Sequence, residues 1–187
     1  MFKTVRVLSE EQLEELRRFD APWVNSHVDD GSSEKSYLDK FNSKRHEQYT
    51  NVRRGHTARK SVNKVILHEW FEDVNQSIEE ETGIPITDCN YLRYDEGDFL
   101  VPHRDTFDGS EDYQYVEGEG KSRTLTTITM VNKSEDLEGG ILIIRHLDDG
   151  QTYHDLEIGE TVIFPSNLVH ECTLITKGWR EVYVGWA

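Results

Sequence analysis

The stretch that decides the fold is Thr124-Leu125-Thr126-Thr127-Ile128-Thr129-Met130-Val131, in which β-branched and apolar residues dominate. Such residues favour extended strands. Runs of similar character recur at intervals of roughly ten residues, with Gly and Asp between them. The expected strands are residues 90–94, 99–105, 124–131, 141–144, 161–164, 168–175 and 179–186. Several short strands separated by turns are typical of a β-sandwich or a jelly-roll barrel.

Two helices are expected ahead of these strands. Ser9 and Gln12 have the spacing of a helix capping box and an apolar stripe follows, so a short helix is predicted over about residues 9–19. A longer helix is predicted over residues 62–82, where apolar residues recur at three- and four-residue spacing. Gly83 suits the left-handed position that follows a helix. Both helices are interpreted as a scaffold for the sheet.

The segment between the two helices is expected to be irregular. Residues 25–61 show little periodicity and contain two glycines, Gly31 and Gly55, so they are interpreted as a mobile lid. The polar interval 106–122 is expected to be mobile as well. The chain is therefore predicted to form one domain over residues 1–187, with helical support and lid in residues 1–88 and the jelly-roll core in residues 89–187.

Composition narrows the class of protein. The chain has 187 residues and a net charge of −15, which disfavours binding to nucleic acid unless a local basic patch overrides it. Basic residues do gather over residues 35–64, either as a solvated segment or as such a patch. No apolar run is long enough to span a membrane, and the two cysteines form neither a disulfide framework nor a metal clip. We expect a cytoplasmic protein.

One constellation of residues indicates chemistry. His103 and Asp105 are two residues apart in a predicted strand, so their side chains are expected on the same face. His170 lies far downstream at the start of another apolar run. Two histidines and one carboxylate form the facial triad that holds non-haem Fe(II) and leaves coordination positions open. The alternative is three unrelated polar groups.

A hairpin argument adds Arg180 to this site. If Thr176-Lys177-Gly178 is a three-residue turn, Arg180 faces Leu174, which shares a face with His170. Arg180 is then expected on the strand next to His170, about four residues or roughly 13 Å away along the sheet. A guanidinium in an apolar barrel suits the bidentate capture of a carboxylate. The alternative is a surface arginine on a slipped register.

From about Arg53 to the C-terminus the chain resembles the iron- and 2-oxoglutarate-dependent dioxygenases of the prolyl 4-hydroxylase-like group. The segments that carry the resemblance are Thr82-Gly83-Ile84-Pro85, Tyr91 to Phe99, His103-Arg104-Asp105, Glu138-Gly139-Gly140, and His170 followed ten residues later by Arg180. The resemblance implies a mainly β fold with supporting helices (α+β) and a double-stranded β-helix (jelly-roll) core. It also implies that His103, Asp105 and His170 bind iron, that Arg180 grips the distal carboxylate of 2-oxoglutarate, and that Tyr94 donates a hydrogen bond to it.

The activity that the resemblance implies is hydroxylation of an unactivated C–H bond. The cofactors would be Fe(II) and 2-oxoglutarate, with ascorbate as a candidate addition, and the products would include succinate and CO2. A prolyl residue in a peptide or protein is the favoured substrate, without membrane or nucleic acid as partner. A free amino acid or other small molecule is an alternative substrate. A base-modifying dioxygenase and a cupin-like metal-binding module without oxygenase activity are the alternative functions.

The chain departs from the family pattern in the strand over residues 126–130. No tyrosine stands where the oxygen-sensing branch has a second cosubstrate-binding tyrosine, so Thr127, Thr129 or Met130 would have to replace it. The six histidines other than His103 and His170 match no ligand position and are not expected to bind the metal. Trp179 and Trp186 are interpreted as core aromatic residues.

Overall fold

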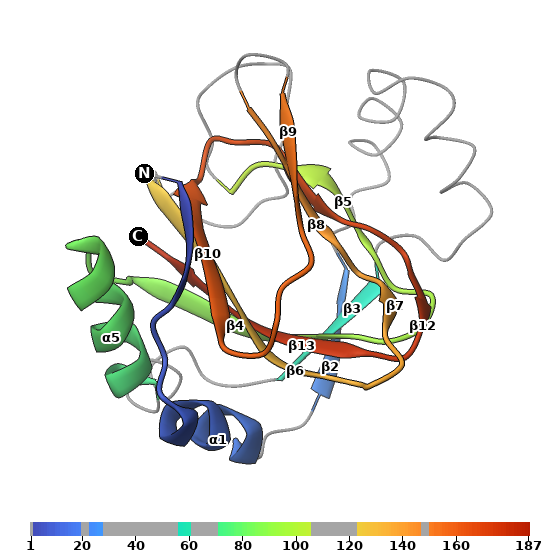
Figure 1. Ribbon diagram of the computed structural model, residues 1–187, viewed down its shortest axis with the longest axis horizontal. Coiled ribbons are helices and arrows are strands. Elements are labelled where there is room, and N and C mark those ends of the chain that lie inside the picture. Colours follow the sequence, from blue (N-terminus) through green and yellow to red (C-terminus); the bar gives the residue numbers. More distant parts are fainter. Residues whose placement is uncertain (1, 20–22, 28–55, 61–70, 106–122, 147–149) are drawn as a thin grey trace.

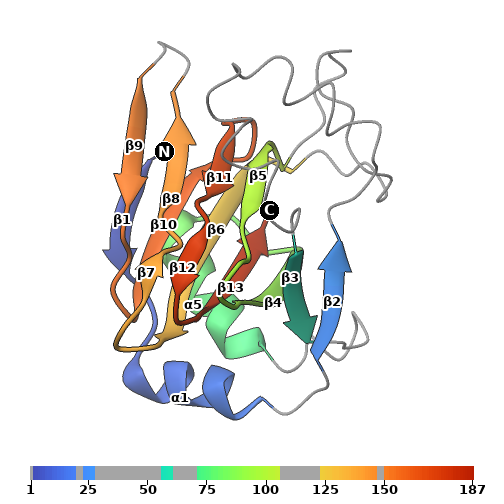
Figure 2. The same ribbon diagram turned by 90° about the vertical axis from the view of Figure 1, so that its right-hand side faces the viewer.

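Two antiparallel sheets face each other in the computed structural model, which describes residues 2–19, 23–27, 56–60, 71–105, 123–146 and 150–187 (Figures 1 and 2). The larger sheet has seven strands in the order β1 (Lys3–Arg6), β10 (Glu160–Pro165), β6 (Leu125–Lys133), β13 (Arg180–Trp186), β4 (Asp88–Tyr94), β3 (His56–Lys60) and β2 (Trp23–His27). The smaller sheet has four, in the order β5 (Leu100–His103), β11 (His170–Cys172), β8 (Leu142–Arg145) and β9 (Gln151–His154). A short pair, β7 (Glu138–Gly139) and β12 (Ile175–Lys177), lies beside them.

The main core fills the space between the two sheets. Along β13, Val182, Val184 and Trp186 alternate with residues of the opposite face and enter this core, as the period of a strand requires. Leu142 and Ile144 of β8 meet them from the smaller sheet. The prediction of a mainly β fold with a jelly-roll core is confirmed.

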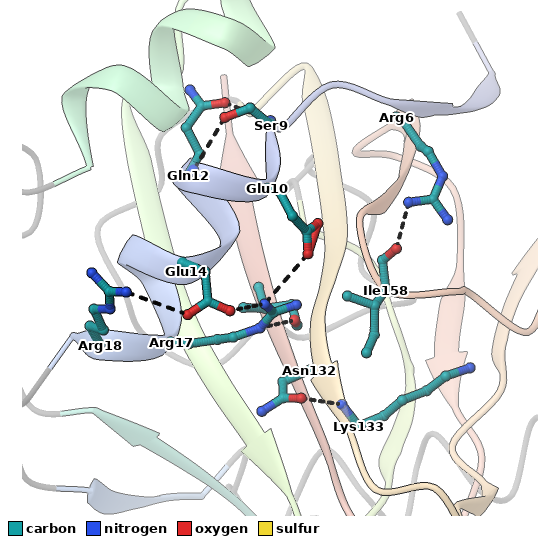
Figure 3. Close-up of polar contacts among 11 residues, drawn as sticks. Arg6, Ser9, Glu10, Gln12, Glu14, Arg17, Arg18, Asn132, Lys133 and Ile158 are labelled. Carbon is teal, nitrogen blue, oxygen red and sulfur yellow. Dashed lines mark hydrogen bonds and ion pairs between the residues drawn. The ribbon is translucent and has the colours of Figure 1, made fainter.

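Helix α1 (Glu10–Arg18) begins at the predicted capping box (Figure 3). The Ser9 hydroxyl accepts from the Gln12 backbone N–H at 3.2 Å, and the Gln12 side chain accepts from the Ser9 backbone N–H at 2.8 Å. Near the other end, Arg17 Nε donates to the Val131 carbonyl of β6 at 3.1 Å, which ties the helix to the larger sheet. The predicted helix over residues 9–19 is confirmed.

Helix α5 (Glu72–Thr82) forms the second half of the longer predicted helix and covers the outer face of the larger sheet. Val74 and Ile78 pack there against Tyr183 of β13. Gly83 follows with φ 72°, in the left-handed conformation expected of it. The first part of the predicted helix, residues 62–70, lies outside the described residues. Among the described helices, none is long and apolar enough to cross a bilayer.

The prediction of an irregular segment over residues 25–61 is wrong at both ends of that range. Strand β2 pairs with β3, and β3 pairs with β4, so the larger sheet gains two strands here. Neither strand alternates apolar with polar residues, and β1 and β9 escaped prediction for the same reason. Residues 28–55 and the interval 106–122 lie outside the described residues, so the lid is untested.

The predicted hairpin around Thr176-Lys177-Gly178 is also wrong. The run 168–175 divides into β11 and β12, and β13 pairs with β4 and β6 in the other sheet. The chain therefore crosses between sheets over residues 173–180 where the sequence suggested a tight turn. Trp179 was predicted to be a core residue but is only half-buried. Its ring lies under the Arg93 guanidinium, with 4.3 Å between the ring centroid and Cζ. Trp186 is a core residue, as predicted.

Candidate metal centre

The two histidines of the site are direct cross-strand partners. Strand β5 ends at His103. The Cα of His103 pairs with the Cα of His170, the first residue of β11. Side chains opposite each other on antiparallel strands point to the same face, and the two imidazole centroids are 4.2 Å apart. In Figure 2 the two strands lie side by side in the smaller sheet. The sequence could not reveal this pairing, because the two residues are far apart in the chain.

Asp105 reaches the histidines from just beyond β5. The sequence prediction placed it on the strand, but the strand ends at His103, so the alternation rule does not orient it. Its backbone N–H donates to the Ser166 carbonyl at 3.0 Å, and Thr126 of the facing sheet donates to Oδ2 at 2.7 Å. Held this way, Oδ1 lies 3.4 Å from His103 Nε2 and Oδ2 lies 3.4 Å from His170 Nε2.

The three side chains can therefore share one ion. Their ligand atoms all lie within 4.8 Å of one another, and no other such group of three occurs among the described residues. His170 Nδ1 donates to the Leu168 carbonyl at 3.1 Å, which leaves the lone pair on Nε2. Two imidazole nitrogens and one carboxylate fit a non-haem Fe(II) site with open positions.

The protonation states suit metal binding. Burial and the charge of His103 lower the pKa of His170 to about 4, despite the opposing effects of Asp105 and the Leu168 carbonyl. Burial would raise the pKa of Asp105, but the charge of His170 and the hydrogen bond and charge of His103 hold it well below its ordinary value. Both groups are therefore deprotonated at neutral pH, which is the form in which they bind metals.

Arg180 lies in the core although the hairpin argument for it failed. It is the first residue of β13 and only 2% exposed, and it enters from the larger sheet rather than from a strand beside His170. One guanidinium nitrogen donates to the Gly140 carbonyl, and Nε is buried without a hydrogen-bond partner among the described residues. Position 140 favours glycine, because φ is +65° and a Cβ would lie 3.1 Å from Arg180 Cδ, so that this side chain would have to shift.

Tyr94 stands beside this guanidinium. The two residues are Cα partners on β4 and β13, and Arg180 Cζ lies 5.1 Å from the Tyr94 ring centroid. Burial raises the pKa of Tyr94 well above its ordinary value, so the phenol remains a hydrogen-bond donor. Tyr94 and Arg180 are therefore neighbours in the core, and their role in binding the cosubstrate stays a prediction.

The register of the smaller sheet places the metal ligands and the guanidinium at different levels of the core. His170 pairs with Ile144, and Gly140, which holds Arg180, lies four residues earlier in the chain. The buried Cys172, whose Cα pairs with Leu142, lies between the two levels. The sequence estimate of the distance assumed a hairpin that does not exist, so that estimate stays a prediction.

Several residues of the site escaped the sequence analysis. Thr126 and Ser166 orient Asp105, and Phe164 packs edge-on against His170 with centroids 4.9 Å apart. The alternation of Thr126, Ile128 and Met130 on β6 could have shown which residues face inward. Of the three replacements considered for the second tyrosine, Met130 enters the core, while Thr127 and Thr129 bond to Gly185 and Thr161.

Comparison with known proteins identifies the family. A model of the 2OG-Fe(II) oxygenase superfamily matches residues 89–187, which include the three candidate ligands and Arg180. The chain belongs to the 2OG-Fe(II) oxygenase superfamily. The donor set and the buried guanidinium of this chain therefore lie within the matched region, as the resemblance seen in the sequence implied.

Curated relatives match parts of the chain. It is 41% identical over 56 residues to a PKHD-type hydroxylase of Picosynechococcus, covering 30% of this chain and 25% of the relative. A PKHD-type hydroxylase of Paracoccus denitrificans is 35% identical over 99 residues, covering 52% of this chain and 41% of the relative. The chain thus matches between about a quarter and two fifths of the length of these two relatives.

Solved structures share the fold at low sequence identity. A viral collagen prolyl hydroxylase from Paramecium bursaria Chlorella virus-1 superposes with a TM-score of 0.58 at 13% identity, covering 99% of this chain and 94% of the other. A prolyl hydroxylase of Trichoplax adhaerens, in complex with a hypoxia inducible factor peptide, gives 0.58 at 12% identity, with 99% and 82% covered. These likenesses confirm the double-stranded β-helix.

Proposed function

We propose that this oxygenase is an Fe(II)- and 2-oxoglutarate-dependent hydroxylase that acts on a prolyl residue in a peptide or protein. The observation that carries the proposal is one buried interior with a metal-ligand set at one level and an incompletely paired guanidinium at another. His103, Asp105 and His170 would hold the metal. Arg180, assisted by Tyr94, would hold the far carboxylate of 2-oxoglutarate.

The residues divide the work between binding and orientation. The Arg180 guanidinium and the Tyr94 hydroxyl bind the cosubstrate at its distal end, because a buried anion needs paired charge and hydrogen-bond donors. The apolar residues between the sheets exclude water from the reacting groups. When bound, Fe(II) supplies the oxidation chemistry, in which 2-oxoglutarate, dioxygen and the C–H substrate give succinate, CO2 and the hydroxylated product.

Support for the hydroxylase comes from the family and the names of its relatives. The matching curated relatives are PKHD-type hydroxylases, and two neighbours with the same fold are prolyl hydroxylases, one of them solved with a peptide. A single domain over residues 1–187, with residues 1–88 as support and lid and 89–187 as core, remains part of the proposal. Strands β2 and β3 would then belong both to the support and to the larger sheet.

The test is turnover with a substrate panel. The chain, loaded with Fe(II), is given 2-oxoglutarate and either proline-containing peptides or free amino acids, with ascorbate present or absent. Succinate and a mass increase of one oxygen on a peptide would support the proposal. Oxygen on a free amino acid alone would favour a small-molecule hydroxylase. No succinate with any substrate, despite tight metal binding, would favour the cupin-like binding module.

A further inference from the structure

A tryptophan beside the candidate ligand Asp105 has no part in the function proposed above. Trp186 is the last residue of β13 and is 7% exposed. Its Cα pairs with that of Thr126, whose hydroxyl donates to Asp105 Oδ2 at 2.7 Å. The Trp186 side chain belongs to the core between the sheets, so it lies on the same face and at the same level as the Asp105 carboxylate.

Among the described residues, the indole of Trp186 has an unpaired hydrogen-bond donor, and the carboxylate of Asp105 has unfilled acceptor sites. Trp186 Nε1 is buried and has no hydrogen-bond partner within the described part of the chain, which is unfavourable for a donor that has left water. A carboxylate offers about four acceptor sites, of which Thr126 fills one and a metal ion would fill another. Because Trp186 and Thr126 are Cα partners and Thr126 donates to Asp105 Oδ2, the indole N–H and the unfilled acceptor sites of the carboxylate lie at the same level of the core.

A second contact restrains the indole ring. The Arg123 guanidinium lies over the Trp186 ring, with Cζ 3.9 Å from the centroid. Arg123 also donates to Asp88 Oδ2 at 2.7 Å, and the Cα of Asp88 pairs with that of Trp186 across β4 and β13. The arginine is therefore anchored at its tip and stacks on the indole, an arrangement that restricts rotation of the ring.

We propose that Trp186 is a positioning residue of the metal centre, whose indole N–H donates to the Asp105 carboxylate when the metal is bound. The Arg123–Asp88 pair holds the ring in the required orientation. With Thr126 and Trp186 both donating to the carboxylate, one oxygen stays turned toward the ion. The inference rests on the proposed function only in taking Asp105 as a metal ligand, and it needs neither 2-oxoglutarate nor a particular substrate.

The test measures metal affinity rather than turnover. Metal-free protein is titrated with Co(II), and the dissociation constant and visible absorption spectrum are recorded for the unaltered chain, Trp186→Phe and Trp179→Phe. The phenylalanine keeps an aromatic ring but removes the N–H. Losing such a second partner of a metal ligand is expected to weaken Co(II) binding by about 10- to 100-fold and to change the spectrum.

Trp179→Phe is the matched control. It makes the same chemical change one residue before β13, at a side chain that packs on Arg93 rather than near Asp105. Its Co(II) affinity should equal that of the unaltered chain. If Trp186→Phe also binds Co(II) with unaltered affinity and spectrum, the inference is overturned.

A third variant guards against a folding defect in Trp186→Phe. Arg123→Met removes the stacked charge at a half-buried position and leaves the indole in place, so Co(II) affinity should fall by a smaller factor than in Trp186→Phe. Unchanged affinity in Arg123→Met would overturn the role given to the Arg123–Asp88 pair. In the unaltered chain, Zn(II) should shift one indole N–H resonance, and a spectrum in which none moves would overturn the hydrogen bond itself.

The outcome is separable from that of the proposed function. An unaltered chain that binds Co(II) but releases no succinate would contradict the hydroxylase and leave the comparison of variants decisive for Trp186. An unaltered chain that binds no Co(II) would overturn both.

Discussion

Replacing Arg180 by alanine is expected to raise the Michaelis constant for 2-oxoglutarate strongly while leaving metal binding nearly unchanged. The side chain is 2% exposed, and Gly140 engages only one of its guanidinium nitrogens. A guanidinium has five N–H donors, so most of them remain for an anion that binds beside Tyr94. Because this environment excludes water, a carboxylate paired there loses little of its attraction to solvent screening.

The size of the effect follows from the bonds lost. Removing a charge-assisted, bidentate pair costs about 2–4 kcal/mol, or roughly 30- to 1,000-fold in affinity. Arg180→Lys should recover part of this loss, because the ammonium keeps the charge without the planar fork. Arg180→Met should lose as much cosubstrate affinity as Arg180→Ala while filling more of the space between Tyr94 and Cys172.

The assay is succinate formation at varied 2-oxoglutarate, together with calorimetric binding of 2-oxoglutarate to the Mn(II)-loaded protein. Arg93→Met is the matched control, because Arg93 pairs with Glu181 on the opposite face of the same two strands, with Nη1 and Oε1 3.0 Å apart. It should leave the Michaelis constant for 2-oxoglutarate unchanged. An Arg180→Met protein with an unaltered requirement for 2-oxoglutarate would refute the role given to this guanidinium.

Three further outcomes are expected. Succinate formation should be abolished in a folded protein by His103→Ala, Asp105→Ala or His170→Ala. Asp105→Glu should abolish it as well, because the longer side chain displaces the ligand oxygen. Full activity of any one variant with added Fe(II) would remove the substituted residue from the metal site. Burial raises the pKa of Cys89 to about 11. At pH 8 its thiol should therefore react with an alkylating reagent far more slowly in the folded than in the unfolded chain. Equal rates of alkylation would contradict the burial of Cys89. Ser9→Ala should lower the free energy of unfolding by about 1 kcal/mol through loss of the α1 cap, as measured by urea denaturation, and no change would show that the cap contributes little.

Much of the fold was predictable because its central strands carry their own signal. Strands β4, β6, β10 and β13 contain concentrated β-branched and aromatic residues, and each was expected close to its observed bounds. Strands β2 and β3 lack this pattern, and their pairing depends on the edge that β4 offers them. Such pairing is a property of the tertiary structure, which local propensity does not contain.

In the candidate site, too, some features could be predicted from the local sequence and others depend on the tertiary structure. The ligand types and their spacing could be read from His103, Asp105 and His170, because the chemistry of Fe(II) restricts the choice of donors. The location of Arg180 could not, because Thr176-Lys177-Gly178 has the composition of a tight turn while the flanking residues pair with different sheets. Turn composition specifies a local bend and says nothing about which distant strand becomes the neighbour.

The single strand β13 carries the guanidinium at its first residue and the indole at its last. An even separation of six residues is what brings Arg180 and Trp186 to the same side of the sheet. Inserting or deleting one residue between them would turn one of the two outward, whereas a change of two residues would preserve their facing and alter only the reach between cosubstrate and metal. Length variation in this strand should therefore be tolerated, if at all, in steps of two, which gives directed evolution of the pocket a simple rule for resizing it.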